Sequence, residues 1–393
     1  MVAEDGDSRH ETLFPTGIRQ KHSGGSLRIS FILPGSSPTP TGGVKIVYEH
    51  ANRLVAKGHD VTILHAAYVT KNSGVRGMGR AVASYLLNRV GLMQWRPDRW
   101  FKVDPRIELL WAPNLAGRRL PDGDAVIATS WQTAEWVREY PYTKGRKFYF
   151  AMDFERFMDA GPELRQRISL LHCSGLRTMV ISPAGSDMIE ANGGAIPCFV
   201  PCALEFAVYN LRTGIKSDDR TMIGFPARPE RHKAMADALN ALEMAINRTG
   251  FTGTVWAFGG ERPAGLPDWV EYHARPSDTE LARLYNLTSI FVVPSLYEGW
   301  GLPGSEAMAC GAALVSTDNG GVRAYAEHGK TALLVPTGNP GLLADAVCSL
   351  LENETERFNL ARAGAEHIRQ FTWERASNDL ERCLDDCLIG GNR

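Results

Sequence analysis

Short apolar runs rich in β-branched residues alternate with stretches of helical periodicity along most of the chain. In the first half the runs lie at residues 27–33, 60–65, 125–130, 147–153 and 196–200. In the second half they lie at residues 221–226, 255–260, 270–272, 289–294 and 313–316. Runs of this length that are apolar at successive positions are typical of strands covered on both faces, as in parallel sheets. The pattern therefore predicts an α/β protein.

Helical periodicity follows several of these runs. After the first run, apolar residues recur at intervals of three and four from Val44 to Val55, and the pattern stops at Gly58. Another helix is expected to begin with Ser182 as its N-cap and Pro183 at its first position. Further helices are expected at residues 234–248, 278–285, 340–351, 355–370 and 373–388. Strand and helix alternation in both halves predicts two doubly wound Rossmann-like domains that face each other across a cleft.

The chain of 393 residues is longer than a single hydrophobic core usually supports, so more than one domain is expected. Between about residues 203 and 219 periodicity is lost and charge increases, which indicates an interdomain linker. We predict the following parts: a flexible tail at 1–26, an N-terminal domain at 27–205, a linker at 206–219, a C-terminal domain at 220–371, and a last helix at 372–393 that returns to the N-terminal domain.

Composition narrows the class of protein. A net charge of -1 argues against a nucleic-acid binder, and the absence of an apolar run of about 18 residues argues against a transmembrane helix. The first 26 residues are polar and lack the hydrophobic region of a signal peptide. Seven cysteines fit a reducing compartment better than a disulfide framework. We interpret the spaced pairs Cys198/Cys202 and Cys383/Cys387 as buried thiols and predict no metal site.

The strongest candidate for chemistry is the segment 294–311, PSLYEGWGLPGSEAMACG, which joins a predicted strand, a glycine-rich turn and a helix start. Its glycines let the backbone approach a ligand closely, and amides at the helix start can bind an anion. Glu298 and Glu306, eight residues apart, suggest acceptors for sugar or ribose hydroxyls. The alternative is a plain strand–loop–helix connection with two acidic residues. By itself the segment predicts a site for a polar ligand.

Two further loops carry features suited to phosphate groups. Arg228 and Lys233 lie five residues apart at a strand-to-helix junction, where two cations and the helix dipole favour a diphosphate. The alternative is that these two residues are simply basic residues at a helix start. We expect Arg231 and His232, which lie between Arg228 and Lys233, to be solvated. Gly42 and Gly43 precede the first helix, a start that presents unpaired amides, although a tight turn explains the pair equally well.

The segment from Glu298 to Glu306 resembles the E-x7-E signature of the retaining GT-B glycosyltransferases of family GT4. Arg228 and Lys233 resemble the Arg-x4-Lys element of that family, and Gly42–Gly43 resembles a glycine pair that faces the donor diphosphate. The resemblance covers about residues 27 to 388 and is strongest after 220. It implies a GT-B fold of two Rossmann-like domains and transfer of a sugar from a nucleoside-diphosphate sugar.

The resemblance also implies roles for individual residues. Arg228 and Lys233 would neutralise the diphosphate, Glu298 would orient the donor sugar, and Glu306 would hold the ribose hydroxyls. The amides of Trp300, Gly301 and Leu302 would approach the sugar and phosphate, and Gly299 would let the backbone come close to the donor. The glycines Gly42 and Gly43 would face the diphosphate, and the loop with Arg275 would meet the base. No metal cofactor is implied, because cations and amides can stabilise the leaving group.

The sequence departs from the family at one position near the reaction centre. Many GT4 members have a histidine at a strand end where this chain has Met152 and Asp153. In this departure the chain resembles a subset of rhamnosyltransferase-like members that have an acidic residue there. We therefore treat Asp153 as a candidate active-site residue and expect a deoxysugar such as rhamnose. The alternative is that Asp153 simply caps the helix that follows it.

The acceptor is expected to meet the N-terminal domain. Residues 71–102 contain seven basic residues against Asp98 alone, interleaved with large apolar ones. This composition is typical of an interfacial or anion-facing surface, although a partly buried helix pair with basic solvent faces explains it equally well. We predict a saccharide or lipid-linked saccharide acceptor in surface polysaccharide synthesis. The enzyme would be cytoplasmic, either free or in peripheral contact with the inner face of the membrane.

Two other classes of function remain open from the sequence. One is a GT-B sugar-nucleotide epimerase or phosphorylase, and the other is a non-catalytic protein that binds sugar nucleotides. The acidic and basic residues at the expected donor site disfavour the non-catalytic class. Nucleic acid is not expected as a partner.

Overall fold

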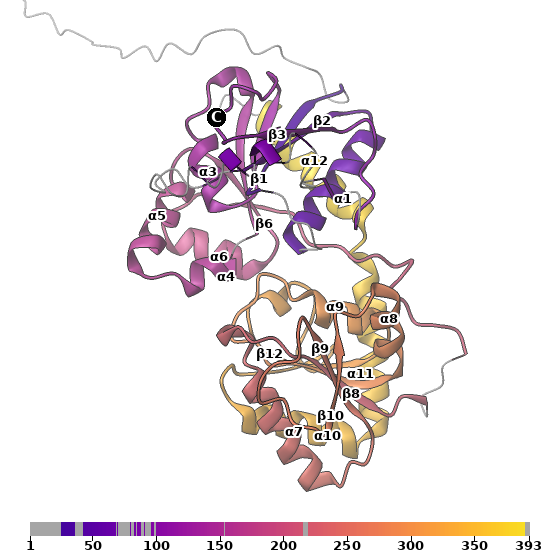
Figure 1. Cartoon of the computed structure of the whole chain (residues 1–393). Helices are drawn as coiled ribbons and strands as arrows, with labels where there is room; N and C mark the ends of the chain where they lie inside the picture. Colours follow the sequence, from indigo (N-terminus) through magenta and orange to yellow (C-terminus); the bar gives the residue numbers. More distant parts are fainter. Residues whose placement is uncertain are drawn as a thin grey trace, which may run out of the picture.

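The computed structural model of the chain describes residues 25–35, 42–67, 69, 79, 82–83, 85–87, 90, 96–97, 100–152, 154–214 and 219–389. These residues form two lobes, each built around one sheet with helices on both faces (Figure 1). Asp153 and most of the segment 71–102 lie outside the described residues. Within the described part, no helix combines the length and the apolar character needed to cross a membrane.

The N-terminal sheet has seven strands in the order β3-β2-β1-β4-β5-β6-β7, and all its pairings are parallel. The strands are β1 Arg28–Leu33, β2 Asp60–Ala66, β3 Glu108–Ala112, β4 Ala125–Ala128, β5 Arg146–Ala151, β6 Arg177–Val180 and β7 Cys198–Phe199. The central strand β4 is buried at every position, because helices cover both faces of the sheet. β3 is partly exposed and was not predicted from the sequence.

The C-terminal sheet has six parallel strands in the order β10-β9-β8-β11-β12-β13. The strands are β8 Met222–Pro226, β9 Val255–Gly259, β10 Val270–Ala274, β11 Thr288–Val293, β12 Ala313–Thr317 and β13 Leu333–Val335. In both sheets the strand order reverses beside the first strand of the domain, which is where doubly wound folds bind ligands. The predicted α/β architecture of two Rossmann-like domains is confirmed.

The helices that are expected from the sequence are present, and the first, Gly42–Ala56, carries the expected apolar stripe. In the N-terminal lobe the helices are α1 Gly42–Ala56, α3 Trp131–Val137, α4 Phe154–Asp159, α5 Pro162–His172 and α6 Pro183–Ala191, with the 3-10 turn η1 Tyr142–Lys144. Later come η3 Arg231–Lys233, α7 Met235–Thr249, α8 Asp278–Leu287, α9 Leu302–Ala309, η4 Gly321–Ala324, α10 Pro340–Glu352, α11 Glu354–His367, η5 Ile368–Gln370 and α12 Trp373–Ile389. Ser182 caps α6 with its side chain, as predicted.

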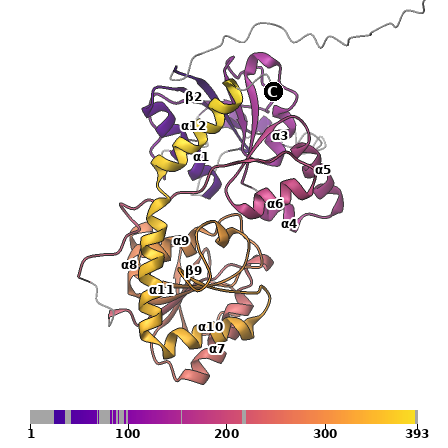
Figure 2. The same cartoon turned by 180° about the vertical axis from the view of Figure 1, so that it is seen from behind.

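The last helix, α12, leaves the C-terminal lobe and packs on the N-terminal lobe (Figure 2). There it lies against α1, and Glu381 forms ion pairs with Lys57 at 2.6 Å and with His59 at 2.9 Å. Where the chain crosses between the lobes, the Leu204 amide donates to the Phe371 carbonyl at 3.0 Å. The outgoing and returning segments are therefore paired at the crossing.

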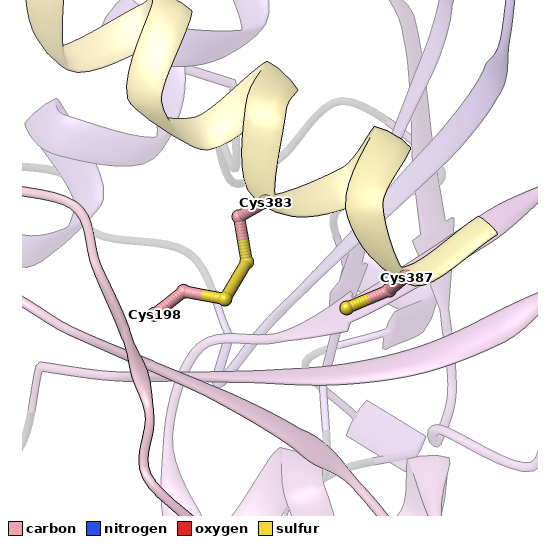
Figure 3. Close-up of side chains that lie close together, drawn as sticks. All are labelled: Cys198, Cys383 and Cys387. Atoms are coloured by element: carbon pink, nitrogen blue, oxygen red, sulfur yellow. A yellow bond between two sulfur atoms is a disulfide. The ribbon is translucent and has the colours of Figure 1, made fainter. Parts of the chain in front are cut away.

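A disulfide joins Cys198 of β7 to Cys383 of α12, and the Cys387 thiol lies one helical turn further on (Figure 3). The three sulfur atoms lie within 4.8 Å of one another. The interpretation of these residues as buried thiols was therefore wrong for Cys198 and Cys383, while Cys202 is a buried free thiol. The two bonded cysteines are 185 residues apart, and their pairing depends on the path of α12.

Candidate active site

The turn between β11 and α9 lies at the carboxyl end of a fully buried strand. Gly301 adopts φ 91°, in the left-handed region that favours glycine, and so directs the chain into α9. Gly321 packs beneath the turn, where a Cβ atom would come within 2.8 Å of the Glu298 carbonyl oxygen. Both glycines are needed for this backbone path, which presents the amides at the start of α9.

Glu298 is buried, with 7% of its surface exposed, and it forms an ion pair with Lys233. The Lys233 Nζ atom lies 2.8 Å from Glu298 Oε2, and the Ser295 hydroxyl donates to Oε1 at 2.7 Å. Lys233 comes from η3, which follows β8, so two predicted site residues from different loops meet at one point. A buried carboxylate with a cation and a hydroxyl donor is held in one orientation.

Glu306 lies in α9, beyond the turn, and is partly buried. The pKa of its carboxyl group is raised to about 7, mainly by burial and also by the negative charge of Asp278, while Lys45 and a hydrogen bond from Tyr285 oppose the shift. The Tyr285 hydroxyl donates to Oε2 at 3.3 Å. Lys45 of α1 pairs with Asp278 of α8 at 3.3 Å, which brings the start of α1 toward this carboxylate.

Gly42 and Gly43 begin α1 and are exposed. A Cβ atom added to Gly42 would lie 3.8 Å from the Leu302 side chain, whereas nothing lies within 4 Å of the corresponding position at Gly43. The first helix of the N-terminal lobe therefore faces the first helical residue after the turn. The structure thus brings the glycine pair and the turn together.

Arg228 and Arg275 follow β8 and β10, at the same edge of the sheet as the turn. Arg228 is exposed, and among the described residues it has no hydrogen-bond or ion-pair partner. Arg275 has φ 49°, and its guanidinium lies 3.5 Å from Glu261 with 74% of the side chain exposed. Both side chains are free to move toward a ligand.

The Trp300 side chain holds the turn against the protein core. The Trp300 ring is buried, packs on Tyr325 with ring centroids 5.2 Å apart, and donates from Nε1 to Ser305 at 3.2 Å. Because the ring anchors the turn in the core, the Trp300 main chain is fixed where a ligand could meet it.

Helix α4 of the N-terminal lobe supplies two acidic side chains that the sequence reasoning missed. Glu155 Oε1 accepts from the Gly299 amide at 2.8 Å, and one turn later Asp159 accepts from the Tyr297 hydroxyl. Burial raises the pKa of Glu155, and the neighbouring Glu298 carboxylate raises it further. The only signal in the sequence is the spacing of four between the two acids, which places them on one face of a helix.

His232 was expected to be solvated, and this expectation was wrong. Its side chain is buried, stacks on Tyr297 with ring centroids 5.1 Å apart, and lies 3.1 Å from Asp159. The histidine is buried because α4 covers it from the opposite lobe. Arg231 beside it is exposed, as expected.

Chemically, the site combines anion-binding and hydroxyl-binding groups. Lys233, Arg228 and the amides at the start of α9 offer positive charge and donors, while Glu298 and Glu306 offer acceptors. These groups gather where the two sheets' helices meet, so a ligand bound there can touch both lobes. The arrangement suits a molecule with phosphates between two hydroxyl-bearing rings.

Comparison with known proteins gives a consistent family. Residues 262–367 match the family model "Glycosyl transferases group 1". The phosphatidyl-myo-inositol mannosyltransferase of Mycobacterium leprae is 24% identical over 388 residues, which is 93% of this chain and 99% of that protein. A D-inositol 3-phosphate glycosyltransferase of Corynebacterium urealyticum is 30% identical over 176 residues, 40% of this chain and 41% of that protein.

Solved structures show the same fold at low identity. The Anabaena protein HepE in complex with UDP-glucose has a TM-score of 0.68 and 16% identity, covering 92% of this chain and 100% of that one. The sucrose-phosphate synthase of Thermosynechococcus elongatus has a TM-score of 0.67 and 15% identity, covering 92% and 99%.

Proposed function

We propose that the chain is a glycosyltransferase that transfers a sugar from a nucleoside-diphosphate sugar to a saccharide or lipid-linked saccharide, with retention of anomeric configuration. The match of residues 262–367 to the model of the glycosyl transferases group 1 and the GT-B fold support this proposal. The observation that carries the proposal is the ion pair of Lys233 with the buried Glu298 beneath the turn, with Glu306 in the helix that follows. In this arrangement the Glu298 carboxylate can bind the sugar, the Lys233 cation can bind the diphosphate, and the Glu306 carboxylate can bind the ribose.

In this proposal Lys233 and Arg228 neutralise the diphosphate, together with the amides from Gly299 to Leu302 and the helix start at Gly42 and Gly43. Glu298 accepts hydrogen bonds from the donor sugar, and Glu306 accepts them from the ribose. Arg275 lies beside the base. The proximity of Gly42 to Leu302 supports a donor enclosed by both lobes.

The bond from the anomeric carbon to the diphosphate oxygen breaks, and the acceptor hydroxyl attacks on the same face. Its proton passes to the departing phosphate oxygen, so no protein nucleophile is required. The barrier falls because fixed cations and amides stabilise the negative charge that develops on the leaving group. We propose that the chain's own cations supply this stabilisation without a metal ion.

The acceptor side of the proposal concerns the segment 71–102. Four apolar side chains there are exposed by 39% to 68%: Val82, Leu86, Leu87 and Val90. Exposed apolar side chains in a segment whose sequence is rich in basic residues favour a lipid-linked acceptor and peripheral membrane contact. The M. leprae relative is named for a lipid substrate, which supports the same choice. Asp153 stays a candidate for contact with the reacting groups.

A thermal-shift screen with UDP-, GDP-, ADP- and dTDP-sugars, including a deoxysugar such as rhamnose, tests the proposal. The true donor should raise the unfolding temperature, because it binds only the folded state. That donor should then be slowly hydrolysed and, with an acceptor, transferred.

Other outcomes identify other functions. An isomerised donor in the absence of acceptor would indicate an epimerase, and turnover that requires inorganic phosphate would indicate a phosphorylase. Binding without hydrolysis or transfer under any condition would leave a non-catalytic sugar-nucleotide-binding protein.

A further inference from the structure

The Glu155 carboxylate accepts a hydrogen bond from one of the backbone amides that the proposed donor would bind. Its Oε1 atom accepts from the Gly299 N–H at 2.8 Å across the boundary between the lobes. A Cβ atom added to Gly299 would lie 3.3 Å from Glu155 Oε2 and 3.4 Å from the Ile181 side chain. The carboxylate therefore packs directly on the turn and accepts the hydrogen bond that the Gly299 N–H donates.

The charges around Glu155 do not balance. Among the described residues, Glu298 and Lys233 of the C-terminal lobe interact with its charge, and so does the Cys202 thiol of the N-terminal lobe. Lys233 already pairs with Glu298 at 2.8 Å, so the cluster of Glu155, Glu298 and Lys233 carries one excess negative charge. Burial and the Glu298 carboxylate together raise the pKa of Glu155, so its ionised form is held there at a cost.

Asp159 makes another contact between the lobes, and that contact does not involve the Gly299 amide. One turn along the same helix, Asp159 accepts from the Tyr297 hydroxyl and lies 3.1 Å from His232. Glu155 is thus a second acidic contact whose partner is a backbone amide at an anion-binding turn.

We propose that Glu155 is an internal anion that holds the Gly299 amide in the empty enzyme and releases it when the nucleoside-diphosphate donor binds. The proposal rests on the proposed function. The incoming diphosphate and Glu155 compete for one amide, and both are negative, so they repel each other as well. Glu155 is a positioning residue of the N-terminal lobe that sets how tightly the C-terminal lobe binds its donor.

Calorimetric titration of the full chain with UDP, GDP, ADP and dTDP tests the proposal in four proteins, the wild type and three variants. Glu155→Gln keeps the shape and removes the charge, and it should bind the preferred nucleoside diphosphate about tenfold more tightly than wild type at about pH 8. Asp159→Asn is the matched control, because it weakens the other contact of α4 without touching Gly299. It should show no gain in affinity. Glu163→Gln, an exposed acid on α5, controls for net charge.

The dependence on pH separates competition from a structural effect. The ratio of the wild-type dissociation constant to that of Glu155→Gln should be about ten at alkaline pH and fall toward one as Glu155 becomes protonated. Titration of Glu306 affects both proteins and cancels in this ratio. A merely structural role would give a ratio that does not change with pH.

The results distinguish the two claims. If wild type binds a nucleoside diphosphate but Glu155→Gln binds it equally or more weakly, the proposal for Glu155 is overturned while the proposed function stands. An equal gain in Asp159→Asn would also overturn it, since looser closure would then explain the effect. If no nucleoside diphosphate binds wild type at any pH, the proposed function fails first.

Discussion

The two faces of the interdomain site are built in different ways. On the C-terminal side, the turn from Glu298 to Leu302 and the helix with Glu306 are contiguous in sequence, and one buried strand positions them. On the N-terminal side, Glu155 of α4 and the start of α1 come from separate segments. The difference suggests a division of labour, in which the C-terminal face binds the donor and the N-terminal face controls access to it.

The largest expected effect comes from the cation on the C-terminal face. Lys233→Ala should lower kcat by about a hundredfold or more, because it removes charge stabilisation of the leaving group and leaves Glu298 buried without its cation. Arg228→Ala should act in the same direction. Steady-state kinetics of sugar transfer is the measurement, with Arg231→Ala, an exposed neighbour, as the matched control. Unchanged turnover in Lys233→Ala would remove its assigned role.

The next effect is a pH dependence that belongs to the same face. In its proposed role Glu306 must be ionised to accept hydrogen bonds from the ribose, and its pKa is raised to about 7, mainly by burial. The carboxyl group is ionised above this pKa, so the donor KM should rise by up to about tenfold for each pH unit below it. Glu306→Gln should bind the donor weakly at every pH and lose this dependence. The same profile in both proteins would contradict the ribose assignment.

Loss of the disulfide in the N-terminal lobe should change the stability of the protein more than its activity. The Cys198–Cys383 disulfide closes a loop with a sequence separation of 185 that contains the whole C-terminal sheet. By loop entropy such a link stabilises the folded state by up to roughly 5 kcal/mol, so Cys198→Ser should lower the Tm by about 5 °C or more. Differential scanning calorimetry measures the shift, and Cys173→Ser, which removes an exposed free thiol, is the control.

If the two lobes act as separate faces, kcat of Cys198→Ser at a temperature well below its Tm should stay within about twofold of wild type. A large loss of transfer in a folded Cys198→Ser protein would show that the link sets the geometry of the site.

The smallest expected effect concerns metal ions. Arg228 and Lys233 are proposed to carry the charge that a divalent cation carries in other enzymes, so EDTA should leave kcat unchanged. The measurement is the rate of sugar transfer with EDTA added, with a control that contains excess Mg²⁺. Loss of activity in EDTA that Mg²⁺ restores would show that the two cations are insufficient.

Most residues of the C-terminal face could be predicted from the sequence, because they lie close together along the chain. A buried strand, a glycine turn and two acids at fixed spacing appear within one segment, and Arg228 and Lys233 follow another strand. The fold class followed from the alternation of strands and helices. The pairing of Lys233 with Glu298 needed the structure, since 65 residues separate them.

The N-terminal face and the links between lobes were much less accessible. Glu155 and Gly299 are 144 residues apart, and nothing near Glu155 marks it as a partner of a backbone amide. His232 looked solvated because its cover, Asp159 with Tyr297, includes a residue from the opposite lobe. The cysteine pairing likewise depends on where α12 lies. Each of these contacts is fixed by how the two domains pack.

The most direct test of the account is hydrogen–deuterium exchange of the full chain with and without the nucleoside diphosphate that binds best. We expect slower exchange in peptides that cover residues 298–306 and 228–233, because their amides and side chains would contact the ligand. Saturating binding with no protection in either segment, and protection elsewhere, would contradict the claim that this turn is the donor site.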